Sequence, residues 1–240
     1  MPSITINAIV LRHTNFRDHD RMLTLFSPDL GKLSVLSRGC RRPKSPLMPS
    51  SELFVMGEFV LFQKKESCIL TSCSISDTFY PLRLDDYRLI CASYVTSLSN
   101  AVIMPNHEAR SLYALLLHQL YHLAYNTTDD ALTLVTAYLV RFSSLIGYKP
   151  RLEHCAHCQA KLQIGKINAF DSIAGGLCCN SCSSRQCDLL SDTHVNWMKS
   201  VLADEGTPAL NDDVKTLFLP LRKHVESRLE SNIKASRFLP

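Results

Sequence analysis

The chain has 240 residues, of which 46% are hydrophobic and 20% charged, and its net charge is +4. This composition is that of a globular protein, and it excludes wholesale disorder and a mini-protein. A net charge this small does not by itself identify a nucleic-acid partner.

The sequence has no targeting or membrane signal. Residues 1–13 lack a basic segment followed by a long apolar core, and no stretch of 18 or more residues is nearly unbroken in apolar character. We therefore expect a soluble cytoplasmic protein with no membrane partner. The ten cysteines are then expected to be reduced or metal-bound rather than paired in disulfides.

The first 80 residues have the pattern of short strands. Alternating or continuous apolar residues predict strands at residues 4–11, 22–26, 33–37, 53–62 and 68–75. Pro28 and Gly31 suit a hairpin turn, residues 64–67 form a polar turn, and Gly57 predicts a bulge or sharp bend. Five short strands favour a closed barrel of the OB type, although an SH3-like barrel fits nearly as well.

Pro81 marks a change from strand to helical spacing. Apolar residues recur at threes, fours and sevens over residues 82–102, and a second helical pattern starts at Pro105. Thr128 is the expected N-cap of a third helix over residues 131–146.

The third helix should end at Gly147, which stands where a C-cap glycine belongs, and Pro150 blocks continuation. A cysteine-rich insert follows at about residues 151–187, and two more helical patterns occupy residues 191–202 and 214–234. The fold class is therefore α+β: an OB-type barrel domain at residues 1–80, and a helical domain at residues 81–240 that the insert interrupts.

Basic residues gather at both ends of the chain. Residues 1–50 hold eight Lys or Arg and three Asp, a difference of +5, and residues 215–240 hold six against two Glu, a difference of +4. The densest group lies in a loop after the third strand and has four cations: Arg38, Arg41, Arg42 and Lys44. Gly39 and Pro43 disfavour a helix or strand in this segment. Such a loop on a barrel is suited to tracking phosphates, but a solubilising loop has the same composition. Five phenylalanines of the barrel region are candidates for base stacking, although each also fits the core: Phe16, Phe26, Phe54, Phe59 and Phe62.

The strongest local signal is a pair of C-x2-C motifs twenty residues apart, Cys155 with Cys158 and Cys179 with Cys182. Zinc prefers four such ligands in a tetrahedron, and a shell of four thiolates leaves no open position, so we expect one structural Zn²⁺. Cys178 adjoins Cys179 and competes with it for the third position, and Cys187, His154 and His157 are also near. Cys179 is preferred because it restores the two-residue spacing with Cys182. A disulfide, an iron–sulfur site and free thiols are the other interpretations.

No sequence motif indicates catalysis. The chain lacks a GxxxxGK[ST] phosphate loop, GxSxG and HExxH, so we expect neither nucleotide hydrolysis nor enzymatic activity. Asp18 and Asp20 are expected to serve turn geometry or to pair with Arg17 and Arg21.

These features together resemble the bacterial RecO family over nearly the whole chain. The matching segments, in order, are AIVL at 8–11, DR at 20–21, LF at 25–26, GK at 31–32, RGCRRPKS at 38–45, RF at 141–142, LIGYKP at 145–150, GGL at 175–177, LR at 221–222 and KASRF at 234–238. Cys40 departs from the family's usual alanine, and Phe16-Arg17-Asp18 departs from a tyrosine–x–glutamate. Not all members keep the zinc cysteines.

The resemblance implies a recombination mediator of the RecF pathway that is not an enzyme. Such a protein binds single- and double-stranded DNA, anneals complementary strands, contacts the C-terminal tail of the single-stranded-DNA-binding protein, and with RecR helps load RecA. The resemblance implies DNA contacts at Arg38, Arg41, Arg42 and Lys44, with Arg12, Arg17 and Lys32. It implies zinc ligands at Cys155, Cys158, Cys179 and Cys182. The rival interpretations are a zinc-ribbon nucleic-acid-binding factor without annealing activity, a thiol oxidoreductase using the paired cysteines, and a scaffold whose basic loop binds RNA or an acidic protein.

Overall fold

A computed structural model describes residues 3–64, 67–163, 165, 167–183, 186–203, 206–229 and 233–240. The chain divides into two compact units. The first comprises Met1–Asp86 and Thr96–Ala124, and the second comprises Tyr87–Val95 and Tyr125–Pro240.

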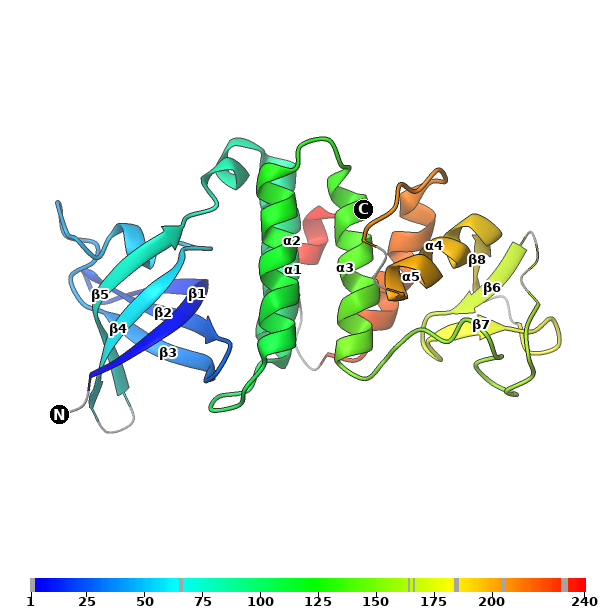
Figure 1. The fold of residues 1–240 in the computed structure, drawn as a ribbon, viewed down its shortest axis with the longest axis horizontal. Helices are drawn as coiled ribbons and strands as arrows, with labels where there is room; N and C mark the ends of the chain where they lie inside the picture. Colours follow the sequence, from blue (N-terminus) through cyan, green and yellow to red (C-terminus); the bar gives the residue numbers. More distant parts are fainter. Residues whose placement is uncertain are drawn as a thin grey trace. The chain divides into compact units, whose positions relative to one another are not determined.

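The first unit contains a closed five-stranded barrel (Figure 1). Its strands are β1 (Ser3–Phe16), β2 (Asp20–Ser27), β3 (Gly31–Ser37), β4 (Met56–Lys64) and β5 (Ser67–Asp77). They follow the order β1-β2-β3-β5-β4, β1 pairs with β4 to close the barrel, and β3 runs parallel to β5. This order is that of the OB barrel, so the predicted fold class is confirmed. Of the predicted turn at 64–67, residues 65 and 66 lie outside the described residues.

Alternating side chains on the strands fill the barrel. Ile6, Ala8 and Val10 of β1 point inward. They belong to one hydrophobic core together with buried residues of β2, β3, β4 and β5. The predicted irregularity at Gly57 is confirmed, because the pairing of β4 with β5 shifts register there. A Cβ atom on Gly57 would lie 2.2 Å from the carbonyl oxygen of Ser74, so only glycine fits this close approach.

Two helices of the sequence pattern begin later than predicted. Leu82 lies in a 3-10 turn, η2 (Tyr80–Leu84), and α1 is Asp86–Val102. The second helix, α2, is Arg110–Tyr125 and does not start at Pro105. Residues 105–109 instead pair their backbone with the β2–β3 turn, as Asn106 N–H donates to Leu30 O at 3.0 Å and Ala109 N–H to Pro28 O at 2.9 Å. These long-range bonds satisfy groups that a helix would otherwise use.

The second unit packs α3 (Ala131–Leu145) against α4 (Asp192–Leu202) and α5 (Val214–Glu226). Asp130, not Thr128, is the N-cap of α3, because its carboxylate accepts a 2.8 Å hydrogen bond from Thr133 N–H. Gly147 has φ +87°, the left-handed conformation expected beyond a helix end.

The last predicted helix is shorter than the pattern at 214–234. It ends at Glu226, and a separate 3-10 turn, η3 (Lys234–Phe238), follows; residues 230–232 lie outside the described residues.

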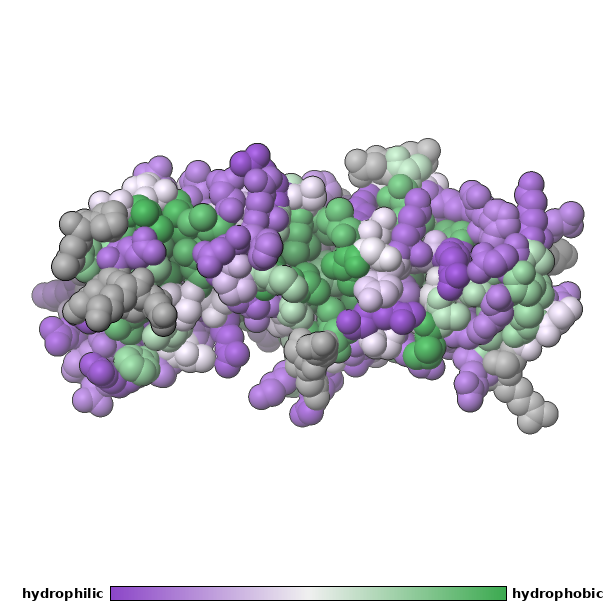
Figure 2. All heavy atoms as spheres, turned by 90° about the horizontal axis from the view of Figure 1, so that it is seen from below, coloured by the Kyte–Doolittle hydropathy of each residue, from purple (hydrophilic) through white to green (hydrophobic). Residues whose placement is uncertain are grey.

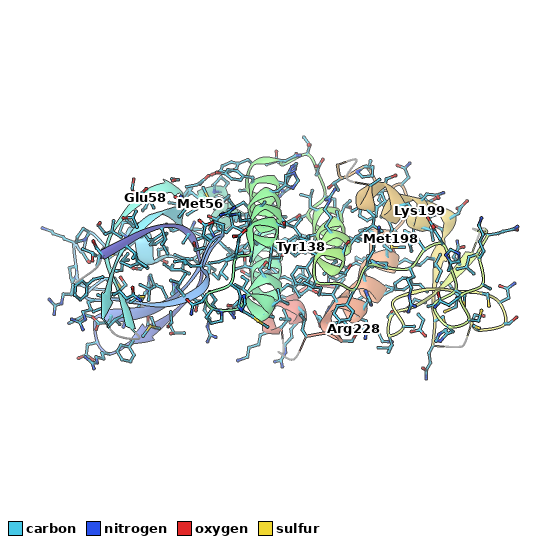
Figure 3. The ribbon with its side chains drawn as sticks, turned by 60° about the horizontal axis from the view of Figure 1, so that its bottom comes forward. Met56, Glu58, Tyr138, Met198, Lys199 and Arg228 are labelled. Carbon is cyan, nitrogen blue, oxygen red and sulfur yellow. The ribbon has the colours of Figure 1, made fainter. Side chains whose placement is uncertain are left out.

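Helix α4 has one side chain in the core next to one near the surface. Met198 is buried, whereas the next residue, Lys199, is partly exposed (Figure 3). On the face drawn in Figure 2, hydrophilic side chains cover most of the surface and hydrophobic ones show between them.

The cysteine-rich insert forms a small antiparallel sheet, with the order β7-β6-β8: β6 (Ile167–Asp171), β7 (Gly176–Cys178) and β8 (Asp188–Ser191). His224 of α5 links this region to the helices through hydrogen bonds. Its two ring nitrogens lie 3.0 Å from Ser172 O and 2.9 Å from Tyr148 O. Among the described residues, no helix is both long enough and apolar enough to cross a membrane.

Candidate nucleic-acid interface and metal centre

The basic loop after β3 is a series of turns that exposes all four of its cations, Arg38, Arg41, Arg42 and Lys44. Gly39 and Lys44 both adopt positive φ, +63° and +62°, which reverses the chain twice within a few residues. Between these cations Cys40 is 1% exposed. The centre of the loop is therefore buried, whereas the charged residues on either side of it are exposed.

The turn between β1 and β2 holds this loop in place. Asp20 Oδ1 accepts a 2.7 Å hydrogen bond from Gly39 N–H, and His19 O accepts one of 3.0 Å from Arg41 N–H. The guanidinium of Arg41 also donates to Asp18 O at 3.1 Å. Asp20 therefore serves loop geometry rather than pairing with Arg21, which forms a 2.7 Å ion pair with Glu52. Sequence reasoning missed this docking, because nothing in the local pattern links residues 18–20 to residues 39–41.

The other three basic candidates lie in different surroundings. Arg17 is in the β1–β2 turn with φ +54°, and its guanidinium lies 5.1 Å from the centre of the half-exposed Phe16 ring. Arg12 is exposed on β1. Lys32 differs, because its ammonium donates to Asn100 O at 2.5 Å and burial lowers its pKa. The structure thus brings Arg17 close to the basic loop and turns Lys32 toward α1.

The aromatic candidates are mostly core. Phe26, Phe54 and Phe59 are fully buried, and Phe26 contacts Tyr113 of α2 edge to face at 5.1 Å. Phe62 is partly buried, whereas Phe16 is 39% exposed. Phe16 beside Arg17 is therefore the phenylalanine of the five that is best placed for a base to stack on.

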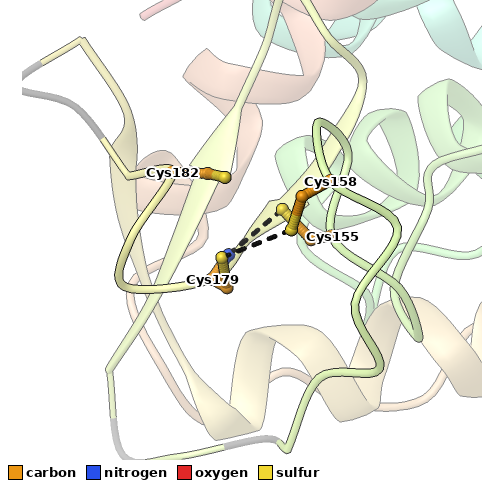
Figure 4. A group of neighbouring side chains, drawn as sticks. All are labelled: Cys155, Cys158, Cys179 and Cys182. Carbon is orange, nitrogen blue, oxygen red and sulfur yellow. Dashed lines mark hydrogen bonds between the residues drawn. The ribbon is translucent and has the colours of Figure 1, made fainter.

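The two cysteine motifs converge on one point. The donor atoms of Cys155, Cys158, Cys179 and Cys182 all lie within 4.8 Å of one another (Figure 4). Each pair sits on its own tight turn: Gln159 N–H donates to Cys155 O at 3.1 Å, and Cys182 N–H donates to Cys179 O at 3.0 Å. The two turns are brought together where Ala156 N–H donates to Leu177 O at 2.8 Å.

The spacing and polarity of these thiols fit a tetrahedral metal. Cys158 Sγ and Cys179 Sγ are 3.7 Å apart, and two thiolates bound tetrahedrally to zinc at 2.3 Å are separated by about 3.8 Å. Burial opposes ionisation of Cys155, but backbone N–H groups of Cys158, Cys179 and His157 outweigh it and lower its pKa to about 5. Hydrogen bonds with Cys179 and Cys158 raise the pKa of Cys182 to about 12, so without a cation this thiol keeps its proton.

Cys179, and not Cys178, lies with the other three thiols. Cys178 is the last residue of β7, and adjacent side chains of an extended chain point in opposite directions. The four-thiol cluster contains Cys179, whose N–H also donates to Cys155 Sγ at 3.4 Å. The Cys178 sulfur is not among the four clustered donors, although Cys178 packs against Cys155.

Comparisons with known proteins cover nearly the whole chain. The family model described as Recombination protein O N terminal matches residues 1–79, and that described as Recombination protein O C terminal matches residues 83–236.

Relatives named DNA repair protein RecO agree with these matches. The protein of Acetivibrio thermocellus is 34% identical over 76% of this chain and 71% of its own length. That of Pelotomaculum thermopropionicum is 30% identical over 97% of this chain and 92% of its own, and that of Desulforamulus reducens 27% over 98% and 93%. The chain therefore belongs to the RecO family of DNA repair and recombination proteins.

Proposed function

We propose that this chain is a non-enzymatic recombination mediator of the RecF pathway. In this role it binds single- and double-stranded DNA, anneals complementary strands, and with RecR helps load RecA on DNA coated by the single-stranded-DNA-binding protein, whose C-terminal tail it contacts. It would act in the cytoplasm, associated with the nucleoid. The proposal rests on family membership and on the exposed basic loop of the barrel.

The barrel domain at residues 1–80 would supply the DNA contacts through Arg38, Arg41, Arg42 and Lys44, with Arg12, Arg17 and Lys32 in supporting positions. Annealing requires no bond chemistry. It needs enough positive charge to let two polyanions approach, and contacts weak enough for the bases to search for register. Four exposed cations on one docked loop meet the first need. Lys32 is the weakest of these contacts, since its ammonium already bonds Asn100 O.

The four clustered thiols would hold one Zn²⁺ with a structural role. A cation at their centre would offset the repulsion between ionised thiolates and favour loss of the proton from Cys182. Four sulfur ligands fill the tetrahedron, which leaves no position for water or substrate. The helical domain at residues 81–240, with this insert at about 151–187, would thus owe part of its stability to the metal.

Annealing of two complementary DNA strands, without nucleotide and across a salt series, tests the proposal. We expect acceleration that fades as salt rises, and a smaller salt slope for the double variant Arg41→Ala/Arg42→Ala. The matched control is Lys161→Ala/Lys215→Ala, which removes two exposed cations of the second unit. Equal loss in both double variants would contradict a specific role for the loop, and no acceleration by the folded protein would contradict annealing itself.

The mediator role needs a separate measurement. RecA assembly on single-stranded DNA coated by the single-stranded-DNA-binding protein should be faster with this chain and RecR together than with either alone. Deleting the C-terminal tail of the single-stranded-DNA-binding protein should remove the acceleration. Assembly that is unchanged by this chain would leave a DNA-annealing protein without mediator activity.

A further inference from the structure

A second group of metal-ligating side chains lies beside the four-cysteine cluster. It consists of His157, between the cysteines of the first motif, Asp171 at the end of β6, and Cys178 at the end of β7. One imidazole nitrogen, one carboxylate oxygen and one sulfur all lie within 4.8 Å of one another. None of the three belongs to the four-cysteine cluster.

The Asp171 carboxylate is held in the orientation that a ligand requires. Its Oδ1 accepts hydrogen bonds of 2.9 Å from both Ile173 N–H and Ala174 N–H. This leaves Oδ2 directed at His157 Nε2, 3.0 Å away. Nitrogen and oxygen ligands of a tetrahedral zinc ion are separated by about 3.3 Å, so a small outward movement of His157 would admit the ion. His157 is 46% exposed, which leaves room for that movement.

The sulfur comes from the protected side of the group. Cys178 is 7% exposed and packs with Cys155 and Ala156. The Cys187 thiol lies in hydrogen-bonding contact with Cys178 and packs against the same cluster. Cys187 is not itself within 4.8 Å of all three donors, so its side chain would have to move to become the fourth ligand.

We propose that His157 Nε2, Asp171 Oδ2 and Cys178 Sγ bind a second Zn²⁺, with Cys187 as the adjacent fourth donor. Mixed nitrogen, oxygen and sulfur donors suit zinc, whereas Mg²⁺ and Ca²⁺ prefer oxygen ligands alone. The backbone hydrogen bonds to Asp171 act as the outer shell that fixes a ligating carboxylate. The second ion would join the first motif to the β6–β7 hairpin and so stiffen the insert. This inference does not depend on the proposed DNA functions.

Metal content of the purified full chain tests the site. We expect two zinc ions per chain, and one after His157→Ala or Asp171→Asn. The asparagine keeps an oxygen for the two backbone N–H groups but replaces the ligand oxygen, so it should fold. His154→Ala is the matched control: it removes an exposed histidine three residues away that is not part of the group, and it should keep two ions. One zinc ion in the native chain, unchanged by His157→Ala, would overturn the proposal.

Cobalt titration separates the two sites without relying on the stability of one variant. Cobalt bound at the four-cysteine cluster gives strong thiolate-to-cobalt absorption. A second equivalent bound at the proposed site should add a smaller increase in this absorption, because only one or two thiolates bind the metal there. That increment should disappear in Asp171→Asn while the first remains. A titration that saturates at one equivalent, or a second increment that survives in Asp171→Asn, would show that His157 and Asp171 form only an ion pair.

Discussion

Asp20 and Gly39, nineteen residues apart, are joined by a 2.7 Å hydrogen bond from the Gly39 backbone N–H to the Asp20 carboxylate. This bond fixes the start of the basic loop against the β1–β2 turn. Gly39 at φ +63° can direct its N–H there without the strain that another residue would meet. The position of the proposed DNA contacts therefore depends on a carboxylate that does not itself attract DNA.

Replacing Asp20 by Ala should loosen the loop although it removes a negative charge. We expect a loss of about 1–3 kcal/mol in unfolding free energy, measured by urea denaturation, since a charged acceptor is lost. Amide exchange of residues 39–42 should rise. Asp20→Asn keeps an acceptor oxygen and should have a smaller effect. Faster exchange elsewhere in the barrel but not in this segment would argue against the docking role.

Removing one proposed zinc ligand should destabilise the second unit. Cys182→Ala, or a strong chelator on the native chain, should lower the melting temperature by about 4–8 °C, as a loss of about 2 kcal/mol does in a protein of this size. The only tryptophan, Trp197 of α4, donates to Pro208 O at 2.8 Å and reports this change by fluorescence. Ser183→Ala, next to the motif and exposed, is the control. An unaltered melting temperature and zinc content in Cys182→Ala would show that the ligand set is wrong.

Two glycines should respond differently to alanine. Gly57→Ala places a Cβ atom 2.2 Å from Ser74 O, so the barrel must shift, and we expect a loss of about 1–3 kcal/mol or more. Gly147→Ala meets no atom within 4 Å and adds only the strain of positive φ, about 1 kcal/mol. Thermal unfolding of the two variants gives the comparison. A larger loss in Gly147→Ala would contradict the close approach of β4 and β5.

The stability of the first unit should fall at alkaline pH through Tyr113. Burial raises the pKa of its phenol to about 12, beside the buried Phe26 ring. Because the folded state favours the neutral phenol, the stabilisation is complete below pH 10 and is lost as pH rises from 10 to 12. Tyr113→Phe should show a smaller decrease in unfolding free energy over that interval. If the native chain and Tyr113→Phe lose the same unfolding free energy between pH 10 and 12, Tyr113 is not the cause of the loss.

Local patterns were sufficient for much of the fold. The alternation of apolar residues predicted the five barrel strands, and Gly57 predicted the irregular pairing of β4 with β5. Gly147 predicted the end of α3, and the two C-x2-C motifs predicted the four-thiol cluster. Each of these depends on neighbours within a few residues, or on a spacing that a tight turn satisfies by itself.

Where long-range hydrogen bonds compete with local preference, the tertiary structure decided the outcome. Residues 105–109 bond the β2–β3 turn instead of starting a helix. Lys32, equivalent by charge to the loop cations, is drawn to Asn100 O. The meeting of His157, Asp171 and Cys178 required β6, β7 and the first motif to be placed together. The sequence by itself determined the barrel strands, the main helices and the paired thiols, because these follow from local periodicity and spacing, but it did not predict the three short strands of the insert. Which side chains meet was decided by backbone pairing between segments distant in sequence, whose register no local pattern specifies.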